Sequence, residues 1–153
     1  FPADLQKECF TAGLLHDIGR LVLAAKLPTA YQEVFDHATE HQISLTDADI
    51  EVFGASHAQV GAYLLGLWKL PDATIEAVGY YHQPSVAVRA EKSPLLTVHL
   101  ANAFFHSIRD LKRPELRSLY TTSIDMDYCL ESGLSEADIS VLRGCCETVL
   151  LRE

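Results

Sequence analysis

Apolar residues recur at helical spacing along almost the whole chain, and this periodicity constrains the fold more than any other feature. One long helix is predicted by a run that contains Ile50, Phe53, His57, Val60, Leu64, Leu67 and Trp68. No stretch alternates convincingly between apolar and polar residues with a period of two, as a half-buried strand would. With 153 residues, the chain is long enough for one domain with a real core. The sequence therefore predicts a single all-α domain over residues 1–153, a compact bundle of six or seven helices.

Capping residues and prolines predict where these helices begin and end. Helix starts are expected at Asp4, Pro28, Thr46–Asp47, Pro71, Ser93–Pro94, Pro114 and Ser135, and one helix is expected to end before Pro84. The apolar face of the first helix is expected to contain Leu5, Phe10, Leu14, Leu15 and Ile18. Ser135 and Asp138 form the S-x-x-D pattern of a capping box.

Charge and cysteine usage exclude several classes of protein. The formal net charge of −9 argues against broad nucleic-acid binding, because phosphate groups would be repelled. No apolar segment is long enough to span a bilayer. The four cysteines form no C-x-x-C pair, so a structural zinc site is not expected, and their pattern suggests a reduced, cytoplasmic protein.

A few polar residues interrupt the apolar helical pattern and are the candidate site residues. His16 and Asp17 lie side by side in "FTAGLLHDIGRLVL", and Gly19 just after them makes a bend plausible there. His57 lies on a helix that otherwise resembles core, and His82 lies at a helix end. Two interpretations stay open for each histidine: a ligand to a metal or substrate, or a hydrogen-bonded core residue, which is more common for a lone histidine.

Other histidines and motifs give weaker signals. His99, Asn102 and His106 share one helix face, where the histidines are more often structural or solvent-facing. His37 and His41 lie on a Glu-rich face that we expect to be solvated. The sequence has no G-x-S-x-G elbow, no P-loop and no H-E-x-x-H motif.

Two stretches resemble the HDOD family, the HD-related output domains of bacterial signalling proteins. One is "AGLLHDIGRLVL", and the other is "EVFGASHAQVGAYLLGLWKLPDATIEAVGYYHQP", which ends at Pro84. The resemblance implies an HD-like helical fold and covers the latter part of such a domain, so we expect the chain to be a C-terminal fragment of a larger signalling protein. The residues after about Lys112 are only generically helical.

The resemblance also implies a metal site, which this sequence matches in part. Hydrolytic HD proteins hold a metal with an upstream histidine, the His-Asp doublet and a later aspartate. His16 and Asp17 match the doublet, whereas Asn102 stands where the later aspartate is expected. Neutral asparagine is a weaker ligand than carboxylate and offsets no metal charge. Relatives that hydrolyse cyclic di-GMP carry a GYP motif after the doublet, and "LAAKLP" follows here instead.

Two hypotheses from different classes follow. The first is a non-catalytic signal-transduction output module with a degenerate metal site, in which a pocket of His16, Asp17, His57, His82 and Asn102 holds a small-molecule or nucleotide ligand or stabilises the helices. It would act on signalling protein partners, behind an upstream receiver or sensor domain as in a response regulator, and it would need no cofactor. The second is a metal-dependent phosphohydrolase or phosphodiesterase, with His16 and Asp17 on Fe, Mn, Mg or Zn.

Overall fold

The structure is a computed structural model that describes residues 2–87, 93–112, 118–120 and 123–151. Within these residues the chain is helical, without a strand. The elements are α1 (Ala3–Leu15), α2 (Ile18–Lys26), α3 (Pro28–His41), α4 (Leu45–Phe53), α5 (His57–Leu67), α6 (Asp72–Tyr80), the short 3-10 helix η1 (Pro84–Val86), α7 (Pro94–Lys112), α8 (Met126–Glu131) and α9 (Glu136–Leu150). The all-α prediction is confirmed, although there are more helices than the predicted six or seven.

One additional helix comes from the joint at His16–Asp17, which places Ile18 in α2 and not in the first helix. Another comes from a break in the long helix that the periodicity predicted through Ile50 and Trp68. Gly54 ends α4 with a left-handed φ of 78°, and Ser56 then caps α5 in a capping box with Gln59. The left-handed glycine ends α4, and the capping box begins α5. The prediction of one continuous helix is wrong because α4 and α5 keep similar apolar spacing on either side of a turn of three residues.

Several predicted boundaries match the structure. Pro28 occupies the first turn of α3, Pro71 precedes α6, and Pro84 lies beyond the end of α6. Helix α7 begins at Pro94, and Ser135 forms the expected capping box of α9. The segment predicted to start at Pro114 lies mostly outside the described residues.

Two details near helix starts are wrong. Ser44, not Thr46 or Asp47, is the N-cap of α4, and its side chain accepts a hydrogen bond from the Asp47 backbone. On α1, Phe10 and Leu14 are 73% and 72% exposed, so they do not form the expected buried face. Ala12 is the buried residue of this helix.

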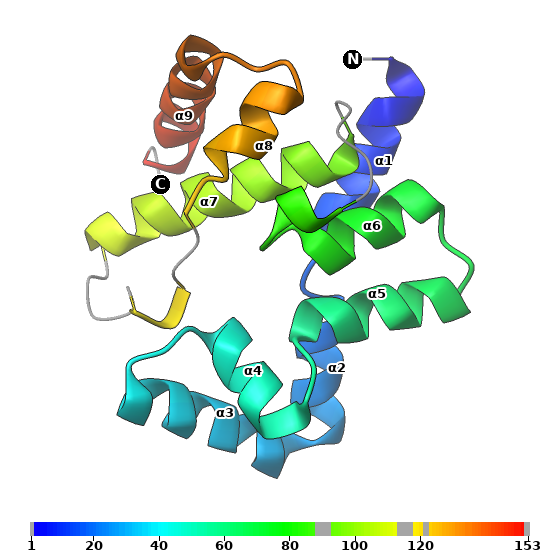
Figure 1. The fold of residues 1–153 in the computed structure, drawn as a ribbon, viewed down its shortest axis with the longest axis vertical. Coiled ribbons are helices and arrows are strands. Elements are labelled where there is room, and N and C mark those ends of the chain that lie inside the picture. Colours follow the sequence, from blue (N-terminus) through cyan, green and yellow to red (C-terminus); the bar gives the residue numbers. More distant parts are fainter. Residues whose placement is uncertain (1, 88–92, 113–117, 121–122, 152–153) are drawn as a thin grey trace.

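Two groups of buried side chains hold the helices together. The α7 cluster consists of Ala12, Ala58, Ala77, Tyr81, Leu95, Leu96, Val98, Leu100, Phe104, Tyr128, Cys129 and Ile139. The α3–α4 cluster consists of Leu23, Tyr31, Val34, Ala38, Leu45 and Ala48. Figure 1 shows the same division, with α3 and α4 at one end of the molecule, α7, α8 and α9 at the other, and α5 and α6 between them.

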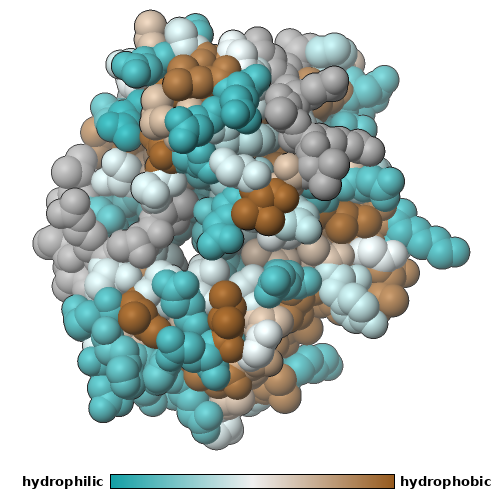
Figure 2. Space-filling model, viewed as in Figure 1, coloured by the Kyte–Doolittle hydropathy of each residue, from teal (hydrophilic) through white to brown (hydrophobic). Residues whose placement is uncertain are grey.

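The surface is mixed in character. On the face drawn in Figure 2, apolar residues form separate patches among hydrophilic ones. None of the described helices has the length and apolar character needed to cross a bilayer. All four cysteines are free thiols.

Candidate functional site

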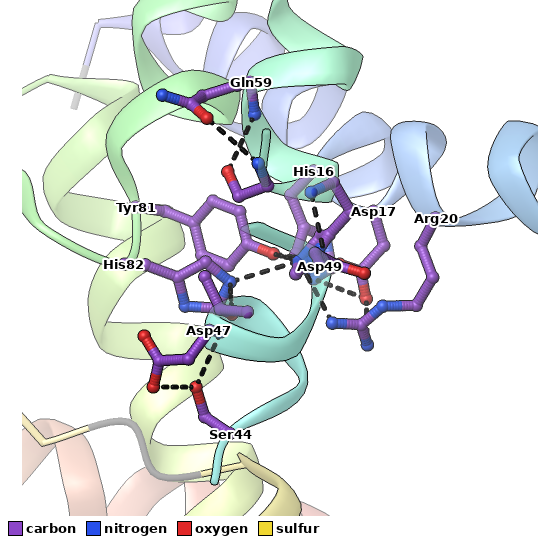
Figure 3. Close-up of polar contacts among 12 residues, drawn as sticks. His16, Asp17, Arg20, Ser44, Asp47, Asp49, Gln59, Tyr81 and His82 are labelled. Carbon is purple, nitrogen blue, oxygen red and sulfur yellow. Dashed lines mark hydrogen bonds and ion pairs between the residues drawn. The ribbon is translucent and has the colours of Figure 1, made fainter. Parts of the chain in front are cut away.

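The His-Asp doublet lies at the joint between the first two helices. His16 is the last residue of the α1 turn, and Asp17 is the N-cap position of α2 with φ −101° and ψ 15°. The chain therefore changes direction at the doublet itself, not at Gly19, which lies buried inside α2. This geometry turns the Asp17 side chain toward α5 and α6 (Figure 3).

Four side chains lie close to the Asp17 carboxylate, and one of them is His57, whose Nε2 atom lies 3.5 Å from Oδ1. The Tyr81 hydroxyl donates a hydrogen bond to Oδ1 at 2.9 Å, and Arg20 Nη1 lies 3.5 Å from Oδ2. His16 Nε2 lies 3.6 Å from the same Oδ2 atom. Burial alone would raise the pKa of Asp17, but the charges of Arg20 and the two nearby histidines outweigh it and lower the pKa. The carboxylate is thus held in its ionised form.

His57 is held by a buried aspartate that the sequence analysis did not select. Both side chains are at most 1% exposed, and the Asp49 Oδ2 atom bonds both the Nδ1 atom and the backbone N–H of His57, the latter at 3.1 Å. The turn between α4 and α5 brings the two residues together. The sequence offered one sign of this pair: Asp49 lies eight residues before His57, on the same face of a continuous helical period as the apolar residues.

Arg20 bridges the doublet and His57. Its Nη2 atom lies 3.0 Å from His57 Nε2, while Nη1 faces Asp17. A guanidinium can only donate, so His57 Nε2 accepts, and the imidazole proton lies on Nδ1 toward Asp49. Burial alone would lower the pKa of Arg20, but Asp17 and nearby tyrosines raise it, so the guanidinium stays charged. Arg20 was not predicted from the sequence, although it lies three residues after Asp17 on the same helix face.

His82 completes the cluster at the end of α6. Its Nε2 atom lies 3.2 Å from His57 Nε2 and 3.3 Å from Thr46 Oγ1. Burial, followed by the charges of His57 and Arg20, lowers the pKa of His82 to about 3. Next to it, burial and the Asp17 charge raise the pKa of Tyr81 well above its usual value. Both side chains are therefore neutral near pH 7.

Helix α7 contributes Asn102 and His106 to the same region. Asn102 is 8% exposed and lines a cavity together with Asp17, His82 and His106. The His106 ring stacks on Tyr120 at a centroid distance of 4.9 Å. Burial and the charges of the nearby arginines lower the pKa of His106 to about 4. The structure thus brings all five sequence-predicted pocket residues, His16, Asp17, His57, His82 and Asn102, into one region.

His99, His37 and His41 lie outside the site. His99 is fully buried, donates from Nδ1 to the Tyr81 carbonyl at 2.8 Å and accepts from the Asp125 backbone N–H at 3.0 Å. His41 is exposed, and His37 is partly exposed and pairs with Glu51. These contacts agree with the structural interpretation of His99 and the solvated interpretation of His37 and His41.

The arrangement around the doublet does not fit a resident metal ion. Among the residues that the structure describes, no group of three or more His, Cys, Asp or Glu side chains is placed to hold one. His16 Nδ1 is bonded to the Gly13 carbonyl at 2.7 Å, and both Asp17 oxygens face other partners. The Arg20 cation lies beside both the Asp17 carboxylate and the His57 imidazole, where it would repel a second cation. Hydrogen bonds and one guanidinium therefore satisfy the groups that a metal would otherwise bind.

Comparison with known proteins identifies the family. The family model described as HDOD domain matches residues 2–84, which is more than half of the chain. An uncharacterized protein of Treponema pallidum (strain Nichols) is 27% identical over 95 residues, which are 62% of this chain and 18% of that protein. The match thus spans about a fifth of this relative's length. No solved structure matches the chain. The resemblance inferred from the His-Asp doublet and the block ending at Pro84 is confirmed, and the chain belongs to the HDOD domain family.

Proposed function

We propose that this chain is a non-catalytic signal-transduction output module with a degenerate HD metal site. The observation that carries the proposal is the position of Arg20, whose guanidinium pairs with Asp17 and donates to His57. An internal cation on a resident side chain neutralises the carboxylate without activating a water molecule. A metal-activated hydroxide, the nucleophile of metal-dependent hydrolysis, has no place in such a network.

The proposal includes a role for the site in holding helices together. The Arg20–His57 hydrogen bond joins α2 to α5, and the Tyr81–Asp17 hydrogen bond joins the end of α6 to the start of α2, so these contacts tie three helices to one point. A ligand or protein partner that alters one of these contacts alters the packing of all three helices. We propose that the module passes a signal to protein partners in this way, as the output part of a response regulator or sensor protein.

The surface supports the proposed partner. Tyr63, Leu67 and Trp68, near the end of α5, are 69%, 60% and 56% exposed. Large apolar side chains that gather on one exposed helix end are typical of a docking surface. The four free thiols fit a reducing compartment, and we propose the cytoplasm as the location.

Metal analysis and a cleavage assay on the same preparation test the proposal. The chain is purified without chelator and analysed for Fe, Mn, Mg and Zn. It is then incubated with bis(p-nitrophenyl) phosphate in the presence of excess Mn²⁺. We expect substoichiometric metal and a cleavage rate equal to that of Asp17→Ala.

The alternative, a metal-dependent phosphohydrolase, rests on the intact His16–Asp17 doublet. Stoichiometric metal, together with cleavage that disappears in Asp17→Ala, would establish the alternative and reject the proposal. An Asp36→Ala variant is the control for nonspecific effects, because Asp36 is an exposed aspartate on α3 outside the site.

A further inference from the structure

A large cavity opens beside the doublet, and His57 is not among the residues that line it. Helix α7 forms its floor, the end of α1 forms one wall, and the second half of α9 forms the other. Its volume is about 630 Å³. We call it the α7 groove. Cavities of about 300–1,000 Å³ are typical of sites for small organic ligands.

The walls of the α7 groove are apolar and incompletely covered. Phe105 on the floor is 50% exposed, and Val149 on the α9 wall is 68% exposed. Helix α9 has Ile139 as its buried residue, which lies outside the groove. An apolar ligand would remove the Phe105 and Val149 side chains from water, a change that stabilises a complex by about 25 cal/mol for each Å² buried.

One end of the groove is polar. His16, Asp17, Asn102 and His106 line this end, whereas Val98, Ala101 and Val149 line the remainder. In the part of the chain that the structure describes, the buried Nδ1 atom of His106 has no hydrogen-bond partner. A buried polar atom without a partner is costly, and a ligand group that bonds it once the ring turns toward the groove would remove that cost.

The charges near the polar end favour an uncharged ligand group. The Asp17 carboxylate lines the groove, and an anionic head would be repelled by it. A cationic head would have to compete with Arg20, which already pairs with Asp17. A hydroxyl or carbonyl group can bond a neutral imidazole without either conflict.

Gly13 leaves this part of the groove open. It lies inside α1, where glycine costs about 1 kcal/mol relative to alanine. A Cβ built at Gly13 would meet no atom within 4 Å, so packing within the described structure does not require glycine. Gly13 lines the groove, and a side chain there would project into the space that a ligand would occupy.

We propose that the α7 groove binds an uncharged amphiphile, with an apolar chain or ring system along Phe105 and Val149 and a hydroxyl or carbonyl group at His106. This ligand class would be the one that the non-catalytic pocket binds. The proposal rests on the proposed function, because the groove ends at the same doublet. A small ligand is favoured over a partner helix because polar residues line one end of the groove.

Titration with 1-decanol, followed by amide chemical shifts and by thermal denaturation, tests the inference. We expect saturable binding with shifts concentrated in α1, α7 and α9. Gly13→Leu fills the groove and should weaken binding at least about tenfold. Gly66→Leu is the matched control, since Gly66 is an exposed helical glycine whose added Cβ also meets nothing within 4 Å, and it lies outside the groove.

Two further arms test the polar contact and the ligand class. His106→Phe keeps a ring but removes the nitrogen, and should weaken decanol binding several-fold. Decanoate should bind more weakly than decanol. No saturable decanol binding, equal binding by Gly13→Leu, or tighter binding of decanoate would overturn the inference.

The remaining outcomes separate this inference from the proposed function. Concentration-dependent dimerisation that Gly13→Leu abolishes would assign the groove to a second copy of the chain and overturn the ligand proposal. Phosphodiester cleavage is scored in a separate assay. Absence of decanol binding therefore leaves the non-catalytic proposal standing, and metal-dependent cleavage would reject that proposal whether or not decanol binds.

Discussion

Gly19 of α2 lies directly against the backbone of His57 of α5. A Cβ built at Gly19 would overlap the His57 carbonyl oxygen and come within 2.6 Å of the Gly61 backbone nitrogen. This close approach of two helix backbones places Arg20, the next residue, within reach of the His57 imidazole. The Gly19–His57 contact therefore positions the site residues as well as packing α2 against α5.

Replacing Gly19 with alanine should strongly destabilise the chain. The obstructing atoms are backbone atoms, so α2 and α5 must separate, and we expect a loss of about 3 kcal/mol or more in the free energy of unfolding. Urea denaturation followed by circular dichroism measures this loss. Gly13→Ala is the control, and it should be neutral or stabilising by up to about 1 kcal/mol, because its Cβ meets open space. Equal stability of the two variants would contradict the packing described for Gly19.

Removing the Asp49 carboxylate should destabilise the protein because it leaves His57 without its partner. In Asp49→Ala, the buried Nδ1–H and backbone N–H of His57 both lose their acceptor. We expect a loss of about 2–4 kcal/mol in the free energy of unfolding. Asp36→Ala, on the exposed face of α3, should change it by less than about 0.5 kcal/mol. A small effect at Asp49 would show that the pair contributes little.

Arg20 and Asp17 should be energetically coupled. Arg20→Met leaves the partly buried Asp17 carboxylate without its cation, and Asp17→Asn leaves the guanidinium without its anion. Each single variant should lose about 1–3 kcal/mol, and the double variant should lose clearly less than the sum. Denaturant midpoints of the four proteins give the coupling energy. Strict additivity would mean that the pair is too far apart, at 3.5 Å, to matter.

Stability should fall between about pH 6.5 and pH 4. The pKa of His82 is about 3 in the folded chain, and that of His106 is about 4. An unfolded histidine titrates near ~6.5, so in this window the unfolded chain binds protons that the folded chain does not. Each such group lowers the free energy of unfolding by about 1.4 kcal/mol per pH unit as the pH falls, and contributes nothing above about pH 7.

Urea denaturation at pH 7 and pH 5 measures this dependence. The loss between the two pH values should be smaller in His82→Gln than in the natural chain, since one of the contributing groups is gone. Replacement of the exposed His41 in the same manner should leave the pH dependence unchanged. An unaltered slope in His82→Gln would contradict the low pKa of His82.

The periodicity and capping patterns predicted the helical class and many helix starts because these depend on local sequence. The break between α4 and α5 was missed because Gly54 and Ser56 interrupt a period that continues on both sides. His16, Asp17, His57 and His82 were predicted from polar groups in apolar surroundings, and Asn102 from the family resemblance. Asp49 and Arg20 were not, since aspartate and arginine on amphipathic helices are usually solvated, and only the approach of α2 to α5 buries them.

The joint at His16 and Asp17 also has a mechanical consequence. Helix α1 is anchored through Ala12 in the α7 cluster, whereas α2 is anchored through Leu23 in the α3–α4 cluster. Only two residues separate these helices, so no loop absorbs strain between them. A rotation of α1 about this joint would therefore move the Asp17 backbone, and with it the carboxylate that Arg20 and Tyr81 contact. The doublet is the short covalent link between the two buried clusters.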